Sequence, residues 1–75
     1  MVLQAERRRL TRTGILAAAA HLFERDGYDS TSVDAIVQEA NVAKGTFYQH
    51  FDSKIAVVRA LAHHELAEKI GRAHV

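Results

Sequence analysis

Apolar residues recur at helical spacing along almost the whole chain, and this periodicity restricts the fold more than any other feature of the sequence. Five of them fall on one stripe of a helix that runs to about residue 26, namely Ile15, Leu16, Ala19, Leu22 and Phe23. Gly27 follows and can end this helix, because glycine adopts a left-handed conformation without steric cost. Tyr28 behind it can fold back onto the last turn. We therefore expect a first helix that ends near Asp26.

Two shorter helices are predicted next, separated by a tight turn. The second helix has an apolar face made by Val33, Ile36, Val37 and Ala40. Either Thr31 or Ser32 can cap it, since both hydroxyls accept a hydrogen bond from a backbone N–H of the first turn. Asn41 comes after its last turn, and asparagine is the best residue after glycine for the left-handed conformation that a tight turn requires. The third helix is expected over residues 43–50.

A fourth helix is expected after Asp52 and Ser53, which can cap it. Its apolar positions are Val57, Val58, Leu61, Ala62, Leu66 and Ile70. Gly71 can end this helix, but the pattern reaches nearly to Val75 without a proline or a cluster of turn residues. We therefore expect the chain to be cut within or just after an element that continues in a longer protein.

The composition agrees with a single helical domain held together by packing. The chain has 75 residues, no cysteine and no proline, and a chain this short buries only about 60% of the surface that its unfolded form exposes. Without cysteine there is neither a disulfide framework nor a thiolate metal site, which fits a reducing setting. The lack of proline and the many alanines favour helix. We expect an all-α, cytoplasmic protein with no membrane span, because no apolar run approaches about 20 residues.

Charge is distributed unevenly, although the whole chain carries a net charge of only +1. Residues 1–25 hold five arginines and two glutamates, a local charge of +3, whereas residues 26–43 hold four acidic residues and no basic one. Any surface for nucleic acid must therefore be local. The run Arg7 to Arg9 superficially resembles a twin-arginine export signal, but Arg12 and His21 interrupt the apolar region that follows. We expect residues 1–10 to form a flexible basic arm, either a disordered tail or an arm that follows the minor groove of DNA.

Residues 32–51 have the shape of a helix-turn-helix, in which the second of two short helices protrudes far enough to enter the major groove of DNA. In that second helix Phe47 and Phe51 lie four residues apart and form an apolar stripe that faces the core. The other faces carry a cation, a phenol, a hydroxyl, an amide and an imidazole, which are groups that donate to phosphates and base edges. Gly45, near the helix start, lets the backbone approach DNA closely.

At these positions the sequence resembles the TetR family of bacterial transcriptional repressors, from Thr11 to Leu61. The resemblance rests first on Ile15-Leu16-Ala17-Ala18-Ala19, Leu22-Phe23, Gly27-Tyr28, Thr31-Ser32-Val33 and Ile36. Its most specific part is the run Val42-Ala43-Lys44-Gly45-Thr46-Phe47-Tyr48-Gln49-His50-Phe51 followed by Ser53-Lys54. A bare helix-turn-helix pattern is weak evidence, whereas this run at fixed spacing seldom arises by chance.

The resemblance implies a three-helix DNA-binding head over residues 11–54 and a fourth helix, residues 55–75, that leads into an absent ligand-binding and dimerisation domain. It implies a repressor that binds a palindromic operator in double-stranded DNA as a homodimer and is released by a small molecule. Phosphate or sugar contacts are then expected from Ser32, Thr46, Tyr48, His50 and Lys54, and the positions nearest base edges are Ala43, Lys44, Gly45 and Gln49. Two positions depart from the family pattern, which usually has glycine at Asn41 and often serine at Ala43. Alanine removes a hydroxyl that can reach DNA or cap the third helix.

Three other functions can be weighed against DNA binding. A helical protein-interaction module that does not bind DNA is the main alternative, and salt distinguishes the two because DNA binding weakens steeply with ionic strength. A metal site or cofactor is not expected, since His63, His64, Glu65 and Glu68 do not have the two-histidine zinc spacing. Enzymatic activity is not expected either, because no nucleophile, base and orienting group occur at informative spacing.

Overall fold

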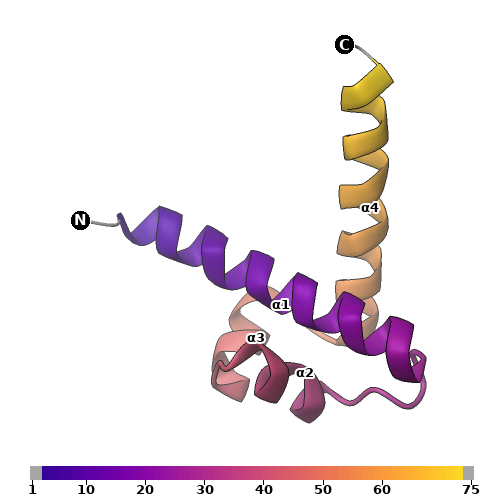
Figure 1. The fold of residues 1–75 in the computed structure, drawn as a ribbon. Coiled ribbons are helices and arrows are strands. Elements are labelled where there is room, and N and C mark those ends of the chain that lie inside the picture. The colour runs from indigo at the N-terminus through magenta and orange to yellow at the C-terminus, as the bar shows by residue number, and fades with distance from the viewer. Residues whose placement is uncertain (1–2, 74–75) are drawn as a thin grey trace.

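The computed structural model describes the backbone of residues 3–73 and the side chains of residues 3–63, and within this range the chain folds into four helices. They are α1 (Gln4–Asp26), α2 (Val33–Ala40), α3 (Lys44–His50) and α4 (Lys54–Ala73). α1 packs against α2 and α4, and α2 packs against α3, while the far end of α4 rises away from the other helices (Figure 1). The prediction of an all-α fold with a helix-turn-helix followed by a fourth helix is confirmed. None of the helices in the described range is long and apolar enough to cross a membrane.

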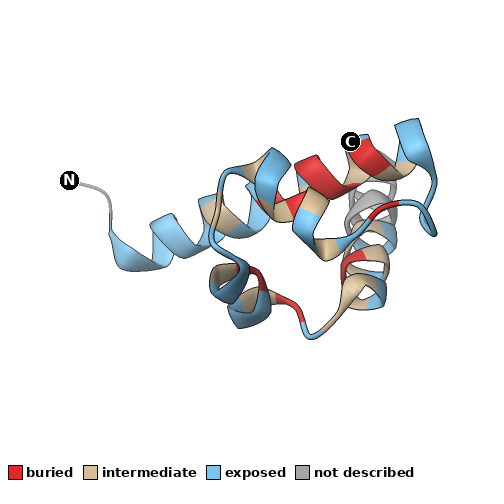
Figure 2. Ribbon diagram, turned by 90° about the horizontal axis from the view of Figure 1, so that it is seen from below, coloured by how far each residue is buried: buried red, intermediate tan, exposed pale blue. Residues whose placement is uncertain are grey.

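One hydrophobic cluster joins the helices. Its buried members are Ile15, Ala19, Leu22, Ile36, Phe47, Phe51 and Val57. Leu16 and Phe23, which the sequence placed on the same stripe of the first helix, are only partly buried and pack against the edge of this cluster. Figure 2 shows the buried positions on the facing sides of the helices, whereas the first turns of α1 are exposed. The core therefore covers only the second half of α1, from Ile15 onward.

The connection between α1 and α2 depends on a glycine conformation and a buried hydroxyl. Gly27 has φ 87° and ψ 158°, so its φ is positive as predicted, but its ψ is not that of the left-handed helical region. This part of backbone space is essentially restricted to glycine. Thr31 is 2% exposed, and its hydroxyl donates to the carbonyl of Gly27 at 2.8 Å and to that of Leu22 at 3.3 Å. This side chain therefore ties the connection to the end of α1.

Ser32 caps α2, which decides between the two candidate caps. Its side-chain oxygen accepts a hydrogen bond from the backbone N–H of Ala35 at 3.0 Å. At the other end of α2, Asn41 has φ 58° and ψ 48°, the left-handed conformation that was predicted for it. The backbone N–H of Val42 donates to the carbonyl of Val37 at 3.0 Å, so the chain turns back at once. This short turn sets the direction of α3.

α1 begins earlier than the sequence indicated, and residues 4–10 are helical rather than a separate arm. The expected boundary between residues 10 and 11 is wrong for these residues, while residues 1–2 lie outside the described range. No side chain caps this helix at Leu3, and consecutive arginines near a helix N-terminus oppose the helix dipole. Both features lower the stability of a helix over residues 4–10. An ion pair on the exposed surface, Glu6 with Arg9 at 3.7 Å, accompanies the helical conformation.

Replacing Phe47 by alanine is expected to unfold the chain or nearly so. The ring is 0% exposed, and loss of a buried aromatic side chain costs about 3 to 5 kcal/mol, against a total stability of about 5 to 15 kcal/mol for small domains. Urea denaturation followed by circular dichroism measures the change. The control is Gln49→Ala, an exposed position on the same helix, which should alter stability by less than about 0.5 kcal/mol. Equal midpoints for the two variants would contradict the assignment of the core stripe.

Candidate nucleic-acid interface

The surface of α3 carries most of the residues that the sequence predicted as DNA contacts. Lys44, Gly45, Tyr48 and Gln49 are exposed, and so is Ala43, which occupies the position before the helix. Thr46 and His50 are partly buried, because they lie beside α1. The structure therefore brings seven of the nine predicted site residues together on one short helix and its N-terminal flank. Ser32 and Lys54 lie on other elements.

Burial of the aromatic side chains fixes which face of α3 points outward. Phe47 is 0% and Phe51 4% exposed, and their ring centroids are 5.8 Å apart. Tyr48 is 48% exposed and stands edge-on to Phe47, with centroids 5.2 Å apart and an interplanar angle of 83°. One edge of the Tyr48 ring thus packs against Phe47, while the rest of the side chain is accessible to an outside partner.

Lys44 forms an ion pair that the sequence did not reveal. Its Nζ lies 2.9 Å from a carboxylate oxygen of Asp34 on α2, and this hydrogen bond raises the pKa of Lys44 above its ordinary value. Both side chains are exposed to solvent, so the pair contributes little to stability. An anion from outside can therefore replace the carboxylate at small cost.

Ser32 retains a hydrogen-bond donor after capping α2. A serine hydroxyl has one donor and two acceptor lone pairs, and the cap uses an acceptor. Because the residue is exposed, its O–H proton is free to donate to a phosphate placed over the start of α2. Capping and the predicted contact are compatible.

Lys54 makes contacts inside the molecule that the sequence did not indicate. Its Nζ donates to the backbone carbonyls of Tyr28 at 2.7 Å and Thr31 at 2.9 Å, and it lies 4.0 Å from the centroid of the Tyr28 ring. The ammonium group thus joins the start of α4 to the connection between α1 and α2. It has three donors, so one remains for the phosphate contact that the sequence predicted.

His50 lies among arginines contributed by α1. Partial burial, together with the cations of Arg8 and Arg12, holds the pKa of His50 below its ordinary value. Arg12 donates to the backbone carbonyl of His50 at 3.3 Å, and its guanidinium lies 4.5 Å from the centroid of the Phe51 ring. α1 therefore supports the C-terminal end of α3. The sequence assigned Arg8 to the basic arm and showed Arg12 only as a charge that interrupts the apolar region after it; the continuous helix that places both on one face was the missing information.

Comparison with known proteins identifies relatives of the helix-turn-helix segment. The family model for "Bacterial regulatory proteins, tetR family" matches residues 15–61. The HTH-type transcriptional regulator UidR of Escherichia coli is 43% identical over 51 residues, which cover 68% of this chain and 26% of UidR. The HTH-type transcriptional regulator YvdT of Bacillus subtilis is 41% identical over 64 residues, which cover 80% of this chain and 33% of YvdT.

A third relative is named as a negative regulator. The Biofilm operon icaADBC HTH-type negative transcriptional regulator IcaR of Staphylococcus aureus is 42% identical over 43 residues, which cover 57% of this chain and 23% of IcaR. The chain thus spans about a quarter to a third of the length of these relatives. No solved structure matches it.

The contacts of Lys54 predict a loss of stability when its ammonium is removed. Lys54→Met keeps most of the aliphatic stem, while the carbonyls of Tyr28 and Thr31 lose a charged donor. Because the site is only partly buried, the expected cost is about 1 to 2 kcal/mol, measured as a lower midpoint in urea. Arg59→Met removes the same charge from an exposed position of α4 and should leave the midpoint unchanged. A Lys54→Met midpoint as high as that of the control would show that the ammonium does not hold α4 in place.

Proposed function

The chain belongs to the TetR family of bacterial regulatory proteins, and from this premise we propose that α3 enters the major groove of a DNA duplex and reads its sequence. DNA-binding transcriptional regulation is the function of the family and of the named relatives. The observation that carries the proposal is the orientation of α3, whose apolar stripe is buried and whose polar residues point outward. A helix held in this way can fit the major groove, which is about 12 Å wide.

The predicted contact residues on α3 and on the elements beside it are proposed to have two roles. Lys44 and Gln49 are exposed and carry a cation and an amide, which recognise guanine and adenine edges respectively. Ser32, Thr46, Tyr48, His50 and Lys54 are proposed to contact phosphates or sugars, which position the helix without reading sequence. Ala43 and Gly45 lie near base edges and offer only backbone and small apolar groups.

Gly45 supports a close approach of DNA to α3. A Cβ atom at this position would meet no atom of the chain within 4 Å, so internal packing does not require glycine. Within a helix, glycine costs about 1 kcal/mol relative to alanine. An outside surface that comes near the backbone explains why this cost is tolerated.

We propose that this chain is part of a longer protein that acts as a dimer. Helix-turn-helix regulators that bind as twofold dimers read two half-sites related by the same symmetry, which makes the operator palindromic. The matched segment accounts for only 23 to 33% of the relatives named above, and we propose that the remaining part carries the dimer interface and the site for a small-molecule ligand. Repression is proposed because IcaR is named a negative regulator.

A salt titration tests DNA binding against the alternative of a protein-interaction module. Affinity of the chain for a duplex, measured by fluorescence anisotropy, should fall linearly on a logarithmic plot with a slope of about −0.9 for each phosphate contact. Selection of bound sequences from random duplexes then identifies the preferred site. Absence of binding at low salt, or binding that salt does not weaken, would overturn the proposal.

Lys44→Ala is expected to reduce sequence preference. If the ammonium donates to guanine O6 or N7, the variant should lose about 1 to 3 kcal/mol on the preferred site, less on random DNA, and tolerate other bases at one position per half-site. Fluorescence anisotropy with the preferred and the random duplex measures both losses of affinity.

The pairing of Lys44 with Asp34 requires a matched control, because Lys44→Ala leaves the carboxylate without its cation. An unpaired Asp34 carboxylate repels the phosphates of DNA. The double variant Asp34→Asn with Lys44→Ala lacks this charge, so any remaining loss of sequence preference comes from the missing base contact. A double variant that regains the full preference of the wild-type chain would show that Lys44 only neutralises Asp34.

A further inference from the structure

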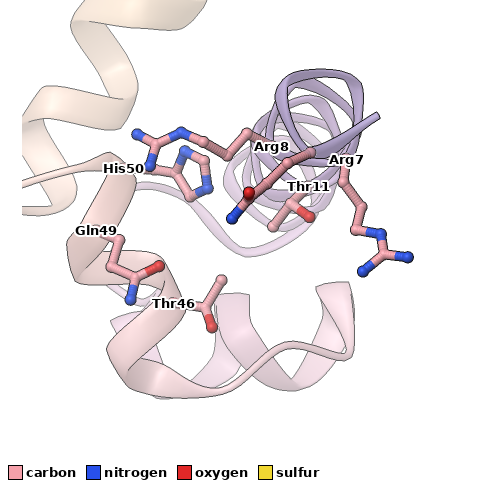
Figure 3. Close-up of a pocket in the computed structure, with 7 residues that line it drawn as sticks. Arg7, Arg8, Thr11, Thr46, Gln49 and His50 are labelled. Atoms are coloured by element: carbon pink, nitrogen blue, oxygen red, sulfur yellow. The ribbon is translucent and has the colours of Figure 1, made fainter. Parts of the chain in front are cut away.

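A groove lies between the first turns of α1 and the side of α3 that faces them. Its volume is about 360 Å³, and it is lined from α1 by Gln4, Arg7, Arg8 and Thr11 and from α3 by Thr46, Gln49 and His50. Figure 3 shows Thr46, Gln49 and His50 on the side toward α1 and the side chain of Arg8 extending beside His50. All four residues contributed by α1 precede residue 15, where the match to the family begins.

The groove has the chemistry of an anion site. None of its lining residues is acidic, and the adjoining hollow lined by Arg8, Arg9, Arg12, Gln49 and His50 has no acidic residue either. Glu6 on α1 pairs with Arg9. Within the described residues, Arg7 and Arg8 take part in no ion pair. Two guanidinium groups, two hydroxyls, two amides and an imidazole therefore remain to donate hydrogen bonds.

The position of Arg8 relative to α3 is set by its neighbour one helical turn later. Arg12 binds the carbonyl of His50 and lies over the ring of Phe51, so this part of α1 is attached to the end of α3. Arg8 and Arg12 are four residues apart and lie on the same face of α1. Arg8 therefore lines the same groove as Thr46 and Gln49 of α3.

We propose that this groove binds a backbone phosphate of the duplex that α3 engages, with Arg8 and His50 as its main ligands and Arg7 contacting the strand beside it. The inference rests on the proposed DNA binding by α3 and adds to it a second contact element, the first three turns of α1. These arginines do not read bases. They fix the position of α3 along the groove and contribute a sequence-independent share of the affinity.

Binding at this site links DNA affinity to a proton on His50. In the free chain the pKa of His50 lies below its ordinary value, because of burial and of the cations Arg8 and Arg12; Arg9 lines the same hollow. A phosphate between these groups favours the charged imidazole and raises its pKa. Between the two pKa values the complex holds more protons than the free chain, so affinity strengthens as pH falls through this window.

The first test is the salt dependence of binding. Arg8→Ala should weaken binding to the preferred duplex and to a random duplex by similar factors and reduce the slope of the salt titration by about 1. The double variant Arg7→Ala with Arg8→Ala should reduce it by about 2. Arg25→Ala, at the opposite end of α1, removes the same charge outside the groove and should keep the wild-type slope. All these positions are exposed, and circular dichroism checks that the variants fold.

The second test is the pH dependence of binding at constant salt. A rise of one pKa unit on binding corresponds to a tenfold gain in affinity at low pH, and the gain should be lost in His50→Gln, whose amide does not titrate. Nuclear magnetic resonance of the His50 ring measures the same shift directly, with and without duplex. In Arg8→Ala the pKa of His50 in the free chain should rise, because one of the cations near it is gone.

The outcomes separate this inference from the proposed function. A wild-type chain that binds no duplex at low salt would overturn both. Binding by the wild-type chain with an unchanged slope in Arg8→Ala, or with a pH dependence that persists in His50→Gln, would leave DNA reading by α3 intact and refute the phosphate site. A reduced slope together with a raised pKa of His50 in the complex is the expected result.

Discussion

The side chain of Phe47 controls the orientation of α3 and therefore of the whole candidate interface. It is fully buried in the cluster that Ile15, Ile36 and Val57 also enter, so each of the other helices contributes to its surroundings. α3 has only seven residues, and an isolated helix of that length is not stable in water. Packing of Phe47 and Phe51 rather than helix propensity keeps α3 formed, and it fixes which residues face outward.

The connection between α1 and α2 is the second structural centre of the molecule. The single hydroxyl proton of Thr31 is shared between the carbonyls of Gly27 and Leu22, and the ammonium of Lys54 donates to the carbonyls of Tyr28 and Thr31 in the connection. Buried or half-buried backbone groups without partners would be costly. Through these contacts, the side chains of Thr31 and Lys54 hold α2 and α4 in a fixed relation to the end of α1.

Folding brings charged side chains from different helices together around α3. The net charge is +1, which gives little attraction to DNA as a whole. α1 places Arg8, Arg9 and Arg12 beside the end of α3, while Asp34 faces Lys44 at the other end of that helix. Basic groups of α1 thus lie beside the C-terminal end of α3, where a strand of DNA passes in the proposed complex, and Asp34 lies at its N-terminal end, where a base contact is proposed.

From the sequence alone, the order of the helices, the helix-turn-helix and the family could be predicted, because these depend on local periodicity, on turn residues such as Asn41, and on a run of residues at fixed spacing. It also identified Phe47 and Phe51 as core residues. Tertiary structure decided the partners of the charged side chains, since Lys54 with Tyr28, Arg12 with His50 and Lys44 with Asp34 meet only when helices pack. It also decided the conformation of residues 4–10, which are helical although the sequence assigned them to an arm. Local rules describe neighbours along the chain, whereas the contacts that position this interface and pair its charges join residues that only the fold brings together.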